Sequence, residues 1–165
     1  MLIGSLFLLI WFTGCCLGSF LMVIGTRVPI HQSIVFPRSH CTNCHHTLSI
    51  FELIPILSYL IQKGRCHDCQ QKISILYPLV ELFMGFAFLF IFSTYLSFPV
   101  EGLFITGIVA FGLIFIISDS YYQLLPNELM SLFFLWVFLG RLVIYPYLIS
   151  FYIFSGLGFF SFFYL

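Results

Sequence analysis

The chain has 165 residues, of which 61% are hydrophobic and only 7% are charged, and its formal net charge at pH 7 is zero. A soluble domain carries about 25% charged residues, so a chain this apolar lacks the polar side chains to cover a water-exposed surface, and we expect a membrane protein. The zero net charge argues against direct binding of nucleic acid. We see no internal repeat in the sequence.

Five apolar runs approach or reach the length needed to cross a bilayer as a helix, which is about 20 residues. In chain order the runs are Leu2–Ile24, Ile73–Pro99, Gly102–Ser118, Leu129–Ile144 and Tyr147–Leu165. Arg141 interrupts the fourth run. The sequence therefore predicts an all-α polytopic membrane protein with four to five transmembrane helices.

The basic residues set the expected orientation. Five of the six lie between the first and second runs, and these are Arg27, Arg38, Lys63, Arg65 and Lys72. By the positive-inside rule this segment faces the cytoplasm, and the N-terminus faces outside. A turn at Pro99–Glu101 then lies outside, whereas the polar turn Ser120–Glu128 lies inside. We expect three parts: a first transmembrane helix at 1–26, a cytoplasmic segment at 27–72 and a transmembrane core at 73–165.

The cytoplasmic segment contains two C-x-x-C pairs, Cys41 with Cys44 and Cys66 with Cys69, separated by 21 residues. Each pair can aim two thiolates at one ion from a tight turn, and four thiolates complete a tetrahedral zinc site. Because the cytoplasm is reducing, metal ligation is favoured over disulfides. Four protein ligands leave no open position, so the expected zinc ion is structural and contributes to folding of the segment.

Two alternatives to a four-cysteine zinc site remain open. The thiols could be unligated or form a redox pair, or a nearby histidine could replace one cysteine as a ligand. The histidines close enough in sequence are His40, His45, His46 and His67. Cys15 and Cys16 lie inside the first apolar run and are expected to pack there as small hydrophobic side chains.

Four segments together resemble the type IV prepilin leader peptidase family, membrane aspartic peptidases that process pilin-like precursors. These segments are GCCLGSF at 14–20, PRSHCTNC through GRCHDC at 37–69, KISILYPLVE at 72–81 and DSYYQLLPNE at 119–128. The LIPILSYLIQKG stretch and the short cytoplasmic segment are most similar to competence-associated members of the family.

The resemblance implies an enzyme of the bacterial plasma membrane that cuts the basic leader from a prepilin or pseudopilin at the cytoplasmic face. Many members also methylate the new N-terminus, with S-adenosylmethionine as the methyl donor. Asp119 matches the first catalytic aspartate of the family, and Pro126 matches the proline that follows it, where a new helix should begin. Met22 stands where the family often has asparagine, which leaves methylation open.

Three further positions are candidates for a structural role or for lining a cavity. Gly18 and Ser19 belong to the family's first-span motif, and Glu81 is an acid inside the second run. Glu81 could line the cavity, bond to a neighbouring helix or assist a catalytic pair, because an ionisable group inside a membrane span is a functional candidate by default.

Aspartic proteolysis uses two carboxylates around one water molecule, one ionised and one protonated. The sequence has two aspartates, Asp68 and Asp119, and Asp68 is expected to be a solvated turn residue between Cys66 and Cys69. The family's Gly-x-Gly-Asp motif, which would carry the second catalytic aspartate, is absent from the sequence. We therefore expect an incomplete peptidase core, truncated within the fifth run and inactive alone. The alternative is a non-catalytic membrane scaffold that binds prepilin or a partner chain carrying the missing aspartate.

Overall fold

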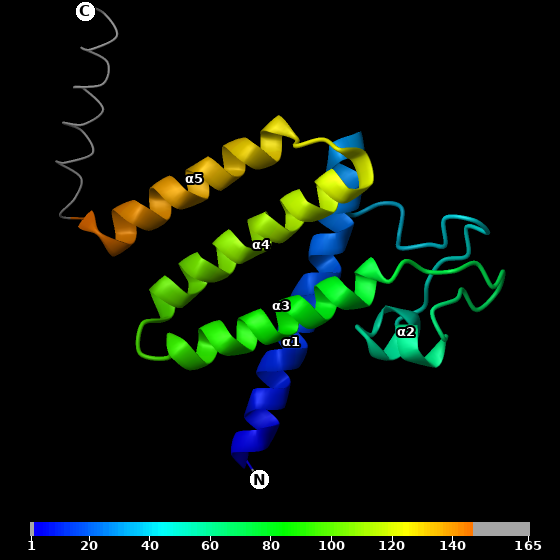
Figure 1. The fold of residues 1–165 in the computed structure, drawn as a ribbon, viewed down its shortest axis with the longest axis horizontal. Helices are drawn as coiled ribbons and strands as arrows, with labels where there is room; N and C mark the ends of the chain where they lie inside the picture. Colours follow the sequence, from blue (N-terminus) through cyan, green and yellow to red (C-terminus); the bar gives the residue numbers. More distant parts are fainter. Residues whose placement is uncertain (1, 147–165) are drawn as a thin grey trace, which may run out of the picture.

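The computed structural model of the chain describes residues 2–146, so the fifth expected run, at 147–165, lies outside the described residues. Four long helices make up most of the fold (Figure 1): α1 (Leu2–Arg27), α3 (Leu76–Thr94), α4 (Pro99–Tyr122) and α5 (Asn127–Ile144). Each is long and apolar enough to cross a membrane. Between α1 and α3 lie two 3₁₀ turns, η1 (Val28–Ile30) and η2 (Phe51–Leu53), and the short helix α2 (Leu57–Ile61). The all-α membrane fold is confirmed for the described residues, which form no β-strand.

The helix bounds differ from the expected runs at prolines and polar ends. The second run was expected to reach Pro99, but α3 ends at Thr94 and Pro99 begins α4. Proline fits the first turn of a helix, where its missing N–H costs nothing. The expected turn at Pro99–Glu101 is therefore wrong, because these residues form the first turn of α4. At its other end α4 continues beyond Ser118 to Tyr122.

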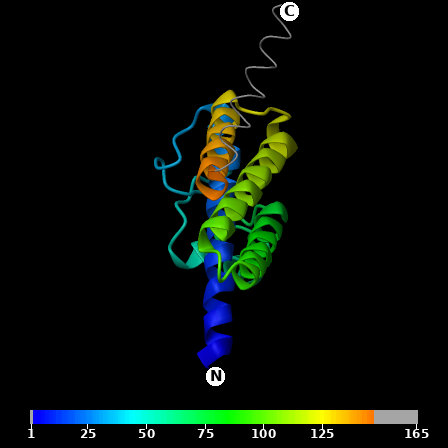
Figure 2. The same cartoon turned by 90° about the vertical axis from the view of Figure 1, so that its left-hand side faces the viewer.

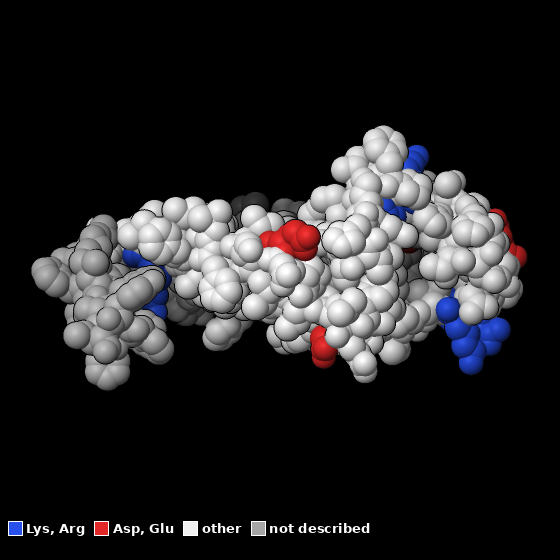
Figure 3. Space-filling view, turned by 90° about the horizontal axis from the view of Figure 1, so that it is seen from above, with Lys and Arg blue, Asp and Glu red and all other residues white. Residues whose placement is uncertain are grey.

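Helix α1 packs against α3 and α4, and α4 also packs against α3 and α5. The N-terminal part of α1 extends beyond the other described helices (Figure 2). The buried core brings together side chains from all four long helices: Leu21, Met22, Val80, Met84, Leu113, Ile114, Ile117 and Leu129. Many other large apolar side chains are exposed on the helices. The face in Figure 3 is accordingly mostly uncharged, as expected for surfaces in contact with lipid.

The α1–α3 crossing depends on two glycines one helical turn apart. A Cβ at Gly14 would lie 2.9 Å from the Cα of Gly85, and a Cβ at Gly18 would lie 2.9 Å from the Cα of Glu81. Both distances are shorter than atoms of a packed interface allow, so only glycine lets the two backbones approach this closely. Small residues four apart are a common means of packing helices in membranes, where lipid is as apolar as the side chains.

We predict that Gly18→Ala destabilises the helix crossing, because the added methyl group meets the backbone of α3. Overpacking of this kind costs about 1–3 kcal/mol. Thermal unfolding of the purified chain in detergent should show a lower midpoint for Gly18→Ala than for the parent chain. Gly112→Ala in α4 is the control, because nothing lies within 4 Å of the place where its methyl group would stand. Equal midpoints for the two variants would contradict the close packing.

Candidate functional site

The first C-x-x-C pair forms a tight turn closed by its own backbone. The N–H of Cys41 donates to the carbonyl of His46 at 2.9 Å, and the N–H of His45 donates to the carbonyl of Cys41 at 3.0 Å. His45 adopts a φ of 58°, which turns the chain back after Cys44. The turn therefore directs both thiols of the pair to one side.

The second pair repeats this turn 25 residues later. Cys66 donates to the carbonyl of Gln71 at 2.9 Å, Gln70 donates to the carbonyl of Cys66 at 3.1 Å, and Gln70 again has a φ of 58°. This internal repeat was not predicted from the sequence. SHCTNCHHTLSI at 39–50 and GRCHDCQQKISI at 64–75 align at this spacing, and the signal is the shared pattern C-x-x-C followed by Ser-Ile.

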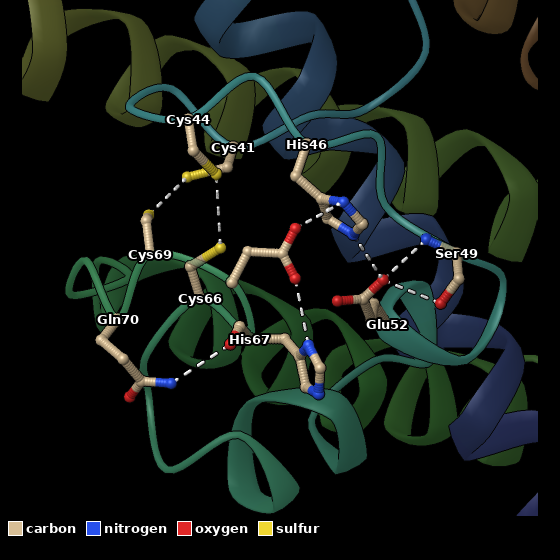
Figure 4. Close-up of polar contacts among 10 residues, drawn as sticks. Cys41, Cys44, His46, Ser49, Glu52, Cys66, His67, Cys69 and Gln70 are labelled. Atoms are coloured by element: carbon tan, nitrogen blue, oxygen red, sulfur yellow. Dashed lines mark hydrogen bonds and ion pairs between the residues drawn. The ribbon is translucent and has the colours of Figure 1, made fainter.

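The two turns face each other, so that their four sulfur atoms form one cluster (Figure 4). The Sγ atoms of Cys41 and Cys69 are 3.7 Å apart, those of Cys44 and Cys66 are 3.9 Å apart, and all four lie within 4.8 Å of one another. A tetrahedral zinc ion with sulfur ligands at about 2.3 Å places its sulfurs about 3.8 Å apart. The cluster therefore fits a metal ion such as zinc, and none of its thiols is in a disulfide.

Backbone amides around the cluster favour its ionised form. The N–H of Gln71 lowers the pKa of Cys69 to about 6, and the N–H groups of Cys44 and Asn43 lower the pKa of Cys41. The His46 N–H acts in the same direction on Cys44, but burial and hydrogen bonds to the other thiols outweigh it and raise the pKa of Cys44 to about 12. A metal ion that binds the four thiolates would displace the protons that the thiols carry.

Three of the four nearby histidines contact acids or backbone, and the candidate metal-binding group among the described residues contains cysteines alone. His46 lies between two carboxylates, with Nδ1 2.9 Å from Asp68 Oδ2 and Nε2 3.5 Å from Glu52 Oε2 (Figure 4). His67 Nδ1 lies 3.1 Å from Asp68 Oδ1, and His40 faces a backbone carbonyl. Asp68 is therefore not merely a solvated turn residue, because with His46 it connects the two cysteine turns.

Asp119 lies in the last turn of α4, where its side chain is exposed. Its carboxylate makes no hydrogen bond or ion pair with the described part of the chain. The turn that follows is held by two bonds: the fully buried Ser118 donates its hydroxyl to the carbonyl of Leu124, and the N–H of Gln123 donates to the carbonyl of Asp119 at 2.9 Å. As the sequence predicts, a new helix begins beside Pro126, which is the N-cap residue of α5.

Asp119 and the cysteine cluster belong to the same end of the helix bundle. The hydroxyl of Tyr122 donates to the carbonyl of Thr26 at 2.8 Å and so ties the end of α4 to the end of α1. The segment that carries the cysteines, residues 28–75 and called the cysteine segment below, follows α1 directly. Asp119 is thus held on a fixed turn, with a free carboxylate, at the end of the bundle from which the cysteine segment emerges.

Glu81 is buried, only 6% exposed, where α1, α3 and the cysteine segment meet. Its Oε2 accepts a hydrogen bond of 2.7 Å from the N–H of Ile56, and it is also hydrogen-bonded to the side chain of Ser19. Gly18 leaves room for the α3 backbone at this point. A bond to a neighbouring helix is therefore among Glu81's contacts, whereas the bond to Ile56 was not foreseen.

These features define a helical membrane protein with a four-cysteine cluster, suited to hold a metal ion, in the segment between its first two long helices. Comparison with known proteins identifies the family. A family model described as the bacterial peptidase A24 N-terminal domain matches residues 12–95. A prepilin leader peptidase/N-methyltransferase of Bacillus subtilis (strain 168) is 37% identical over 132 residues, which cover 79% of this chain and 52% of that protein. The chain belongs to the prepilin leader peptidase/N-methyltransferase family.

Two further relatives carry the same description. One from Myxococcus xanthus (strain DK1622) is 51% identical over 86 residues, covering 52% of this chain and 26% of that protein. One from Klebsiella pneumoniae is 34% identical over 128 residues, covering 73% of this chain and 55% of that protein. The chain spans about half the length, or less, of the curated relatives it matches. No solved structure matches it significantly.

Proposed function

We propose that this chain takes part in removing leader peptides from prepilins or pseudopilins at the cytoplasmic face of the bacterial plasma membrane. The proposal rests chiefly on one observation: in a chain that matches the family over residues 12–95, the carboxylate of Asp119 is unpaired and exposed at the same end of the bundle as the cysteine segment. The competence-associated resemblance of 53–64 favours pseudopilins of a DNA-uptake machine as substrates.

Asp119 would supply one of two carboxylates that act on one water molecule. One carboxylate, ionised, takes a proton from the water, and the other, protonated, donates to the carbonyl oxygen of the scissile peptide bond. Asp68 is engaged with His46 and His67, and Glu81 is engaged with the Ile56 amide, so neither is free for this role. We propose that the second carboxylate comes from a polypeptide segment other than 2–146.

The four cysteines would hold a structural zinc ion. The sulfur spacing matches a tetrahedral site, and four thiolates leave no coordination position for substrate or water. Zinc would fasten the two turns to each other, while His46 and Asp68 orient them around it. The ion's role is then to shape the segment rather than to take part in peptide cleavage.

Methylation of the new N-terminus is a second part of the proposal, with S-adenosylmethionine as the methyl donor. Two grooves on the described surface are large enough to hold parts of such a cofactor, and both are lined by apolar side chains or glycine, apart from one tryptophan in each. Neither offers the charged and polar groups that an amino-acid tail, a ribose and an adenine need. We therefore assign no methyl-donor site to the described residues and derive no step through it.

A cleavage assay tests the proposed function. The chain would be incubated in detergent with a prepilin, both alone and fused to the part of the Bacillus subtilis relative that it does not cover. We expect leader removal by the fusion. Prepilin binding without cleavage by the fusion would instead support a membrane scaffold, and neither binding nor cleavage would refute the proposed role in prepilin processing.

A further inference from the structure

The stretch between the two cysteine turns, residues 50–61, lies beside a membrane-spanning helix. Leu8, Leu9, Trp11 and Phe12 of α1 line one side of a groove of about 360 Å³, and 55–57 line the other. Phe12 precedes Arg27, the end of α1, by 15 residues, which is about 22 Å along a helix. The stretch therefore lies beside the apolar N-terminal half of α1, far from Arg27 at the C-terminal end of that helix.

The same stretch exposes large apolar side chains that nothing in the described structure covers. Five residues are more than half exposed: Ile50 at 75%, Phe51 at 80%, Leu57 at 53%, Leu60 at 64% and Ile61 at 79%. A soluble segment of this size rarely exposes such a group, because apolar surface is costly in water. Leu57 lies across the groove from Leu8 and Leu9 of α1, which are 66% and 63% exposed.

Several backbone N–H groups of the stretch are hydrogen-bonded within it, as an apolar environment demands. N–H groups of Glu52, Leu53, Leu57, Ser58, Leu60 and Gln62 donate to carbonyls between Ser49 and Ser58. Pro55 has no N–H to satisfy. At the start, the carboxylate of Glu52 accepts from both the N–H and the hydroxyl of Ser49, at 2.8 Å each.

Glu81 supplies the acceptor that the stretch itself lacks. Ile56 immediately precedes α2 with a φ of 64°, and its N–H donates to Glu81 Oε2 on α3. A buried carboxylate inside a transmembrane helix is costly unless it is hydrogen-bonded. The bond therefore satisfies both groups and fixes the stretch against the transmembrane helices.

We propose that residues 50–61 insert into the hydrocarbon of the bilayer beside α1, with lipid acyl chains as the partner of their exposed face. The exposed apolar side chains, the position of 55–57 opposite α1 and the hydrogen bonds within the stretch point to hydrocarbon rather than water. Polar groups flank the stretch, with His46 and Ser49 before it and Lys63 and Arg65 after it, and the two basic side chains can reach lipid headgroups. The cysteine turns would then lie at the membrane surface, close to the end of α4. This inference needs only the membrane placement and not the peptidase activity.

Depth-dependent quenching of tryptophan fluorescence tests the insertion. The full chain contains two tryptophans, Trp11 and Trp136, both replaced by phenylalanine in the background. Phe51→Trp and Ile61→Trp would be introduced singly, and the purified chains reconstituted in phosphatidylcholine vesicles with brominated acyl chains. Thr42→Trp is the control, because Thr42 is exposed between Cys41 and Cys44 and outside the stretch. We expect quenching at 51 and 61 to exceed that at 42 by at least about twofold.

Variants of Glu81 test whether its hydrogen bond to Ile56 fixes the stretch against the transmembrane helices. Glu81→Gln keeps an acceptor oxygen for Ile56 and should preserve the quenching at 51, whereas Glu81→Leu should reduce it. If Glu81→Leu does not fold, the ratio of quenching at 51 to quenching at 42, measured with Glu81 in place, decides whether the stretch is inserted. Quenching at 51 and 61 no greater than at 42 would overturn the proposal. Quenching at 51 and 61 that a prepilin helix peptide abolishes would also overturn it, because the face would then contact a protein partner.

Discussion

Cys41→Ser or Cys66→Ser should remove the metal ion and unfold the segment between α1 and α3. Each change leaves three sulfur ligands from the cluster, and the segment has little buried apolar core of its own, with Cys66 and Pro55 its buried apolar side chains among the described residues. Structural zinc contributes about 10–16 kcal/mol of apparent binding free energy in small zinc modules, so most of the segment's folding energy would be lost. Elemental analysis should give about one zinc per parent chain and nearly none per variant.

Limited proteolysis would report the unfolding, with cleavage at Lys63 and Arg65 becoming fast in the variants. Cys16→Ser is the matched control, because Cys16 is an exposed cysteine on α1 outside the cluster. It should leave both metal content and protease resistance unchanged. A Cys41→Ser, Cys66→Ser double variant that resists protease as well as the parent would contradict a metal-dependent fold.

Asp119→Asn should abolish prepilin cleavage by the fusion of this chain to the uncovered part of the Bacillus subtilis relative. Asparagine has nearly the same shape but cannot take or give the proton that the reaction moves, and general acid–base catalysis contributes about 10²- to 10⁴-fold to a rate. We expect kcat/KM to fall by at least about this factor. Because the Asp119 side chain is exposed and its backbone bond to Gln123 is unaffected by the substitution, the unfolding midpoint and the zinc content should not change.

Glu128→Gln is the control for this prediction. Glu128 is an exposed acid in the first turn of α5, across the same turn from Asp119, and removing it changes the net charge by the same amount. It should retain most of the activity. An equal loss of activity in both variants would show that the charge of this surface matters, and would contradict a specific role for Asp119.

The helices could be predicted because long apolar runs leave few alternatives to a transmembrane helix. Their bounds were less certain: the sequence indicated a turn at Pro99–Glu101, whereas α3 ends at Thr94 and Pro99 already begins α4. The cysteine cluster could also be predicted, since C-x-x-C spacing reports local turns. The repeat of those turns was missed because few of its side chains are identical.

The contacts that organise the site join residues far apart in an irregular segment. His46 meets Asp68, and Glu81 meets Ile56, only because the two cysteine turns face each other and the stretch between them folds back along the helices. Neither the periodicity of apolar residues nor the spacing of the cysteine pairs predicts these contacts. For the same reason, the sequence could not show that Ser118 and Tyr122 hold the turn that carries Asp119.

Mass spectrometry of a prepilin incubated with the fusion to the Bacillus subtilis relative tests the central proposal most directly. The account predicts two products, the leader and a mature pilin whose first residue starts the hydrophobic helix, and it predicts that the Asp119→Asn enzyme yields only intact prepilin. Formation of the same products at an undiminished rate by the Asp119→Asn enzyme would contradict the account.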